Sequence, residues 1–170
     1  MDHPQVMTAD KTAVGWREWV GLPDLNTAWV KAKIDTGARS SALHAFDLET
    51  FTRDGKDWAR FSVHPWQRSD NNGHLVETPI FEWRSIRSSS GESEERPVLR
   101  TSLRIGESTH EVDLTLARRD EMGFRMLVGR EALRGKFVVD PARSYLAGKP
   151  GREVIAANRK RSPTEAGLDA

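Results

Sequence analysis

An alternating segment that runs into an aspartate limits the possible folds of this chain more than any other feature. Within residues 27–35, TAWVKAKID, the apolar residues Val30, Ala32 and Ile34 alternate with Lys31 and Lys33. A period of two is the pattern of a β-strand with one buried face. The segment ends at Asp35 and continues as Thr-Gly-Ala, where the glycine permits a tight turn. We therefore expect a strand that presents a carboxylate at its end.

Short strand-like segments occupy most of the remaining chain. Residues 14–22 form one, and residues 98–106 and 109–117 alternate on either side of a Gly-Glu-Ser turn, which predicts a β-hairpin. Residues 125–129, RMLVG, are a short apolar run typical of a strand buried on both faces. A short helix is expected in GREALRGK, and residues 136–147 predict a strand, an Asp-Pro turn and a second strand. This pattern predicts a mainly β fold, a closed antiparallel barrel with one short helix in a single lobe.

The chain has 170 residues, which is enough for one domain of ordinary size. Residues 1–13 are polar and aperiodic, and we expect a flexible N-terminal arm. Residues 14–147 should form the folded domain. Residues 148–170 are rich in glycine, proline and charge and predict a disordered tail. The first dozen residues lack the apolar core of a secretory signal, and no apolar run approaches the roughly 20 residues that span a bilayer, so we expect a cytoplasmic protein.

Charge and composition exclude several classes of function. The chain has 26 Lys and Arg against 25 Asp and Glu, so its formal charge of +1 gives no electrostatic reason to expect a nucleic acid or a membrane surface as a partner. It contains no cysteine, which excludes thiol nucleophiles and cysteine-based zinc sites. The histidines lack the H-E-x-x-H spacing of zinc hydrolases, and no phosphate-binding P-loop motif occurs. We expect no metal and no cofactor, although a metal-dependent hydrolase built from scattered residues remains an alternative.

The D-T-G string has two interpretations when it is taken alone. Aspartate often caps a turn, and a three-letter match is weak evidence. The context favours a catalytic role, because the D-T-G-A string is followed by a hairpin candidate at Ser88 to Gly91, by Leu127-Val128-Gly129, and then by the short helix. This order resembles that of the retropepsin family of aspartic proteases.

The resemblance is closer to one bacterial subfamily, the RimB-like proteins that are often labelled ATP-dependent zinc proteases. It is carried by VGWREW, KAKIDTGARSSALHA, RPVLRTSLRIG and FRMLVGREALRGKFVVDPARSYL, and it covers about residues 14 to 147. Despite the label, the motifs point to acid catalysis without zinc or ATP in this chain.

The resemblance implies a set of site residues. The catalytic loop would be Asp35, Thr36 and Gly37, and the residues expected to bind substrate are Ala38, Arg39, the flap residues Ser88, Ser89, Ser90 and Gly91, and Val128, Gly129 and Arg130. Arg39 departs from the pattern of retropepsins, which usually have an acid or a small polar residue there, so the substrate preference of the viral enzymes does not carry over. A cation at this position would favour an acidic peptide, and Arg130 could add to it. The alternative is that Arg39 pairs with a local carboxylate.

Aspartic protease chemistry needs two carboxylates that share one proton. This chain contains a single D-T-G string, so the second acid should come from an identical subunit across a two-fold axis. The resemblance implies that Thr36 from each chain locks the base of such a site. We therefore expect a homodimer.

These observations predict a homodimeric aspartic endopeptidase that binds a peptide or protein substrate. Because the subfamily often lies beside ATP-grasp ligases that add glutamates to protein ends, the resemblance implies a glutamate-rich or ligase-modified tail as substrate. One alternative is a non-catalytic binding module of the same fold that regulates an ATP-grasp ligase or a ribosomal partner. The other is the metal-dependent hydrolase already mentioned.

Overall fold

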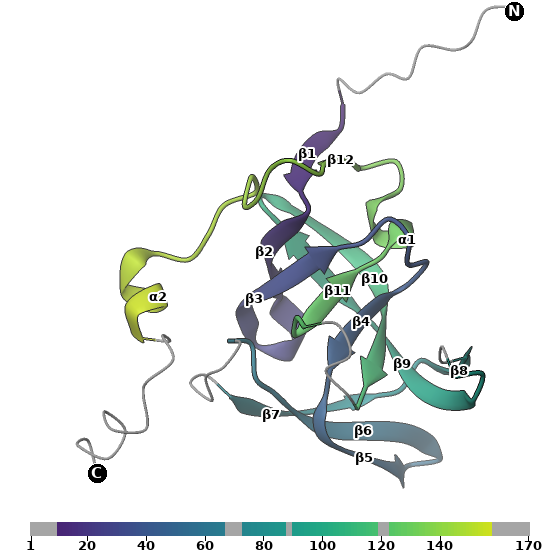
Figure 1. Ribbon diagram of the computed structural model, residues 1–170. Coiled ribbons are helices and arrows are strands. Elements are labelled where there is room, and N and C mark those ends of the chain that lie inside the picture. Colours follow the sequence, from purple (N-terminus) through teal and green to yellow (C-terminus); the bar gives the residue numbers. More distant parts are fainter. Residues whose placement is uncertain (1–9, 67–72, 88–89, 119–122, 158–170) are drawn as a thin grey trace, which may run out of the picture.

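The computed structural model describes residues 10–66, 73–87, 90–118 and 123–157, and strands dominate them (Figure 1). The strands are β1 (Thr12–Gly15), β2 (Arg17–Leu22), β3 (Thr27–Ile34), β4 (Ser41–His44), β5 (Phe46–Arg53), β6 (Lys56–Val63), β7 (His74–Pro79), β8 (Glu82–Arg87), β9 (Ser93–Ile105), β10 (Ser108–Ala117), β11 (Met126–Val128) and β12 (Phe137–Asp140). The helices are η1 (Pro23–Leu25), α1 (Arg130–Leu133) and α2 (Arg152–Ala157). The prediction of a mainly β fold is confirmed.

The largest sheet has seven strands in the order β10-β4-β11-β3-β2-β9-β8. Strand β9 also pairs with β10, so hydrogen bonds connect the first and the sixth strand of this order. Strands β5, β6 and β7 form a second sheet, which lies below the first in Figure 1, and β1 pairs with β12.

Strand direction differs from the expected antiparallel arrangement at three places. Most pairs are antiparallel, but β11 runs parallel to β3, β4 runs parallel to β10, and β1 runs parallel to β12. A period of two predicts that a segment is a strand, but it does not show whether the strand runs parallel or antiparallel to its neighbours. Parallel partners need long crossover connections, and these three pairs join segments that are far apart in the chain.

The core lies where the alternation predicted it. In β3 the side chains of Val30, Ala32 and Ile34 are buried, while the intervening lysines remain partly exposed. The predicted hairpin is confirmed as β9 and β10, which pair in register from Ser108 opposite Ile105 to Thr115 opposite Val98. Its inward residues join the same cluster: Leu99, Leu103, Ile105, Val112, Leu114 and Leu116.

The predicted strand after the Asp-Pro turn is absent. Backbone N–H groups of this segment donate to a buried carboxylate instead of to a neighbouring strand. Glu18 is fully buried, and its carboxylate accepts N–H groups from Gly15 at 2.6 Å and from Leu146 and Ala147 at 2.9 Å each. Tyr145 adopts a left-handed φ of 59° just before these amides. The segment is therefore an irregular strap bound to a carboxylate.

Three further observations concern the predicted segments. The expected strand of residues 14–22 is interrupted at Trp16, whose N–H donates to the carbonyl oxygen of Arg143. Helix α2 lies within the segment that was expected to be a disordered tail, and most of the expected N-terminal arm lies outside the described residues. In the part of the chain that the structure describes, no helix is both long enough and apolar enough to cross a membrane.

Candidate active site

Asp35 lies at the carboxyl end of β3, on the loop that leads to β4. Strand β3 pairs with β11 so that Ile34 lies opposite Val128, and the N–H of Asp35 extends this pairing by donating to the carbonyl oxygen of Val128 at 2.9 Å. The Asp35 residue is half-buried, whereas Thr36 and Gly37 are exposed. The acid is therefore anchored through its backbone while remaining accessible to solvent.

The turn holds the carboxylate in a defined orientation. Oδ1 of Asp35 accepts the N–H of Gly37 at 2.9 Å, and the Asp35 carbonyl oxygen accepts the N–H of Ala38 at 3.3 Å. An aspartate that bonds to the backbone two residues later is a common turn device. A Cβ at position 37 would lie 3.2 Å from Oδ1, so the absence of a side chain at Gly37 lets the amide approach the acid.

The loop after the turn rests on the start of α1. The N–H of Arg130 donates to the carbonyl oxygen of Ala38 at 2.7 Å, and the N–H of Glu131 donates to that of Arg39 at 3.1 Å. The first amides of a helix have no acceptor within the helix, so the loop satisfies them. The Arg130 guanidinium also donates through Nη1 to the carbonyl oxygen of Thr36 at 3.1 Å. Helix α1 and the catalytic-loop candidate therefore form one hydrogen-bonded unit.

Gly129 allows this close contact. A Cβ there would lie 2.4 Å from the carbonyl oxygen of Ser40, a distance that no side chain tolerates. Its N–H donates to Oγ of the buried Ser41 at 3.0 Å. Val128 is fully buried and Gly129 is buried as well, so both support the loop from below, whereas Arg130 is exposed beside Thr36.

The segment that we expect to be a flap joins β8 and β9, and these two strands are called the flap strands below. These strands pair from Glu82 opposite Val98 to Arg87 opposite Ser93, and Figure 1 shows β8 at the edge of the molecule. Ser88 and Ser89 lie outside the described residues. Ser90 and Gly91 are exposed in the turn, where Gly91 has a φ of 86° that favours glycine. None of the β8 side chains is fully buried, so the ladder to β9 and polar contacts hold this strand.

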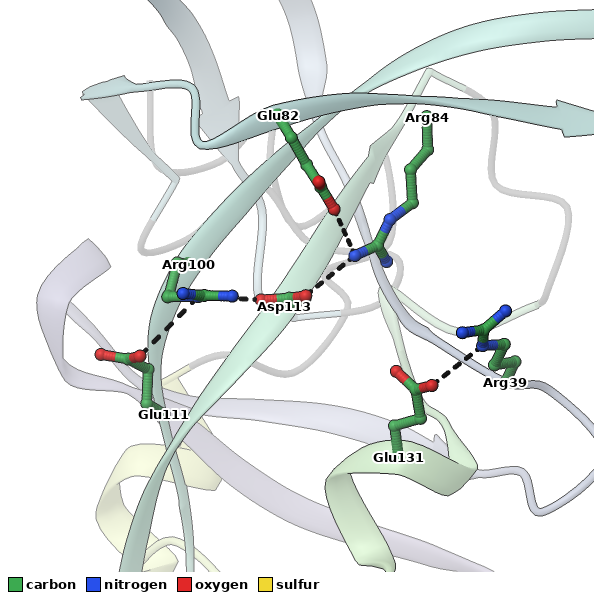
Figure 2. A network of polar contacts seen from close by, with 7 residues as sticks. All are labelled: Arg39, Glu82, Arg84, Arg100, Glu111, Asp113 and Glu131. Carbon is green, nitrogen blue, oxygen red and sulfur yellow. Dashed lines mark hydrogen bonds and ion pairs between the residues drawn. The ribbon is translucent and has the colours of Figure 1, made fainter.

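Those polar contacts centre on Asp113 of β10 (Figure 2). Its Oδ2 accepts from Arg84 of β8 at 2.8 Å and its Oδ1 accepts from Arg100 of β9 at 3.1 Å, so one acid on β10 binds a side chain from each strand of this hairpin. Arg84 also pairs with Glu82, and Glu111 lies 3.7 Å from Arg100. The sequence carried a signal that we missed: Asp113 is a single acid between the apolar Val112 and Leu114.

A pocket of about 410 Å³ lies beside this network. Its lining includes Ser40 and Ser41 from the loop after D-T-G-A, Asp113 from β10 and Glu131 from α1. The pocket therefore lies between the segment after the D-T-G-A turn, strands β9 and β10, and helix α1.

Arg39 has a local carboxylate partner. Its Nε lies 2.9 Å from Oε1 of Glu131, and the Arg39 side chain is 79% exposed while that of Glu131 is 41% exposed. The hydrogen bond from Arg39 is the main reason that the pKa of Glu131 lies below its ordinary value. Sequence reasoning identified Arg39 but missed Glu131, because no local pattern pairs residues so far apart in the chain.

Among the described residues, no group of three or more histidine, cysteine, aspartate or glutamate side chains could hold a metal ion. Two tryptophans near this region have different surroundings. Trp66 is buried against Trp19 with ring centroids 4.8 Å apart, whereas Trp83 on β8 is 40% exposed and donates to Asp57 at 3.0 Å.

Comparison with protein families identifies the family of this chain. The model of the retropepsin-like aspartic endopeptidase RimB family matches residues 13–150, which includes Asp35, the flap strands and α1. The chain belongs to the RimB-like family. The family resemblance predicted from the sequence is therefore confirmed.

Curated relatives of this RimB-like chain are named probable alpha-L-glutamate ligases. The protein of Desulfotalea psychrophila is 38% identical over 92% of this chain and 34% of its own length. Those of Shewanella pealeana and Parasynechococcus marenigrum are 41% and 44% identical over 85% and 86% of this chain, and each match covers 32% of the relative. The RimB-like chain thus spans about a third of the length of these relatives, and the ligase name describes the whole proteins.

A solved structure has a similar fold. The Legionella pneumophila protein Lpg0085, described as having unknown function, superposes with a TM-score of 0.65 at 25% identity. The match covers 80% of this chain and 98% of that protein.

Proposed function

We propose that the chain is an aspartic peptidase that hydrolyses peptide bonds with a water activated by two Asp35 carboxylates, one from each subunit of a homodimer. The observation that carries the proposal is the placement of Asp35, whose backbone is anchored to β11 and whose carboxylate is held by the N–H of Gly37. Membership of the RimB-like family supports the same chemistry.

In the proposed mechanism the two carboxylates share one proton, because two carboxyl groups about 3 Å apart do not both ionise. The ionised member takes a proton from water while the water oxygen bonds to the scissile carbonyl carbon, and the protonated member donates its proton to the carbonyl oxygen. The C–N bond of the resulting tetrahedral intermediate then breaks as the carboxyl group that took the water proton passes it to the leaving amine. The other carboxylate takes a proton from a hydroxyl of the intermediate, which re-forms a carbonyl and restores the shared proton.

The second acid would come from another copy of the chain, as the single D-T-G string requires. The surface next to Thr36 supports this assembly. It contains a hollow of about 540 Å³ lined by Thr36, by Arg130 of α1, by Arg134 just after the helix, and by four apolar or proline residues: Leu133, Phe137, Val139 and Pro141. Burying such a surface against a symmetric copy is favourable, and it would bring the two turns together.

We assign the peptide substrate to the space between the loop and the flap. Ser88, Ser89, Ser90 and Gly91 would close over it, Ala38 and Arg39 would line it, and Val128, Gly129 and Arg130 would keep the loop in place. The exposed Arg39 favours acidic side chains. The names of the relatives add support for a glutamate-rich substrate and for a functional link to a glutamate ligase.

The test compares wild type with Asp35→Asn on a peptide that ends in several glutamates. Asparagine keeps the size of the side chain and removes its acid, so the rate should fall by about a thousandfold or more while unfolding is little changed. Sedimentation of both proteins checks the dimer. Equal cleavage by the two proteins, or cleavage by a strict monomer, would refute the proposed mechanism.

The ligase names of the relatives also favour a second candidate, a non-catalytic module of this fold that binds or regulates a ligase. Binding to a glutamate ligase without cleavage of any peptide between about pH 4 and pH 8 would support that function.

A further inference from the structure

The ion pair between Arg39 and Glu131 joins two residues that serve the same loop. Arg39 follows the D-T-G-A turn, and Glu131 lies in the first turn of α1. Figure 2 shows the two side chains pointing at one another at the edge of the charged network, with Nε and Oε1 2.9 Å apart. Arg39 is nevertheless the more exposed partner, at 79% of its side-chain surface, so most of its guanidinium faces solvent.

The backbone fixes the separation of this pair independently of the ion pair between the side chains. The N–H of Glu131 donates to the carbonyl oxygen of Arg39, and the neighbouring N–H of Arg130 donates to that of Ala38. Loop and helix therefore stay together whether or not the carboxylate of Glu131 remains on the guanidinium. Exposed ion pairs contribute little to stability, so replacing one carboxylate by another at Arg39 costs little.

Three arginines act on the carboxyl group of Glu131. The hydrogen bond from Arg39 is the main reason that its pKa is lowered, and the positive charges of Arg39, Arg84 and Arg134 add to this effect. When the Glu131 carboxylate leaves Arg39, the exposed guanidinium lacks this counter-ion next to the Asp35 turn. A carboxylate from another molecule could then neutralise the charge of the Arg39 guanidinium.

We propose that Glu131 occupies on Arg39 the place that an acidic side chain of the substrate takes, so that Glu131 and the substrate compete for one guanidinium. Glu131 would thus set specificity by holding Arg39 away from weakly acidic peptides and releasing it to strongly acidic ones. This inference rests on the proposed function, because it assumes that an acidic peptide binds beside the Asp35 turn.

The test measures binding without cleavage. A fluorescent peptide of five glutamates and a matched peptide of five glutamines are titrated with the full chain carrying Asp35→Asn, alone and combined with Glu131→Gln. Removing the competitor should tighten binding of the glutamate peptide about two- to fivefold, the range expected for an exposed ion pair. Binding of the glutamine peptide should stay unchanged. Adding Arg39→Gln should abolish the difference that Glu131→Gln makes.

Two controls keep the outcome clear. Glu107→Gln makes the same charge change at an exposed position in the turn between β9 and β10 and should leave both affinities unchanged. Glu131→Ala serves as a second variant should the glutamine protein unfold. Weaker binding of the glutamate peptide would mean that Glu131 orients Arg39 for substrate. That result overturns the inference. So does an equal change in affinity for both peptides, or no change in affinity for either.

The outcomes also separate this inference from the proposed function. If the wild type cleaves the glutamate peptide and Glu131→Gln leaves affinity unchanged, only the competition is wrong. If no peptide is cleaved but Glu131→Gln tightens glutamate binding through Arg39, the competition stands and the catalytic proposal falls.

Discussion

The backbone N–H of Asp35 lies 2.9 Å from the carbonyl oxygen of Val128 and donates a hydrogen bond to it. This contact joins the D-T-G-A turn to the Leu-Val-Gly segment, which comes much later in the chain. Because β3 and β11 are parallel, both segments end at the same edge of the sheet. The two motifs therefore form one structural unit.

The tight contact between these motifs predicts that Gly129→Ala damages the site. The added methyl group would lie 2.4 Å from the carbonyl oxygen of Ser40, so loop and helix must separate. Overpacking of this kind costs about 1–3 kcal/mol, and the displaced loop should lower peptidase activity. Urea unfolding and a cleavage assay measure the two effects. Gly151→Ala is the matched control, since a Cβ there meets nothing within 4 Å. Equal stability of the two variants would contradict this account.

The buried carboxylate of Glu18 predicts a second stability effect. It accepts three backbone N–H groups, and Glu18→Gln replaces one acceptor oxygen with a donor that faces an amide. Leaving a buried donor without an acceptor should lower the free energy of unfolding by about 1–3 kcal/mol. Hydrogen exchange should become faster at Leu146 and Ala147. Glu107→Gln provides the control at an exposed position. Unchanged exchange in the strap would show that other contacts hold it.

The position of Asp113 between Arg84 and Arg100 predicts a role in placing the flap. Asp113→Asn weakens the contacts at 2.8 Å and 3.1 Å that attach both flap strands to β10. We expect faster hydrogen exchange in β8 and a higher KM for peptide, with a smaller change in kcat, because the variant leaves the Asp35 turn intact. Glu111→Gln is the control, since Glu111 is 70% exposed and lies 3.7 Å from Arg100. A change in kcat alone would argue against this role.

His110 predicts a dependence of stability on pH. Burial and the positive charge of Lys136 lower the pKa of His110 below its ordinary value. Below about pH 6.5 the imidazole therefore binds a proton more readily in the unfolded chain than in the folded protein. The free energy of unfolding should decrease as the pH falls below this value. The decrease should end once the pH is below the lower pKa of His110 in the folded protein.

Denaturant unfolding at about pH 7.5 and about pH 5 measures this decrease. The decrease should be smaller in His110→Gln, which has no titrating group there. In Lys136→Met the pKa of His110 should rise towards its ordinary value, which an NMR titration would detect. An identical loss of stability in wild type and His110→Gln would assign the effect to other groups.

The sequence by itself determined the elements that depend on local pattern. Alternation located β3, the β9–β10 hairpin and their buried faces, because the period of two is a property of each strand alone. Apolar length and flanking glycines located β11 and α1. The strings around Asp35 and Gly129 were also sufficient to identify the family.

Only the tertiary structure decided the features that join distant segments. Three such features connect residues that are far apart in the chain. Strand β3 pairs in parallel with β11, Glu18 accepts backbone N–H groups of a segment that was predicted to be a strand, and Glu131 pairs with Arg39. The amides, carboxylates and guanidinium groups of these residues interact because folding brings them close together. Alternation and propensity describe neighbours along the chain and therefore hold no information about these choices.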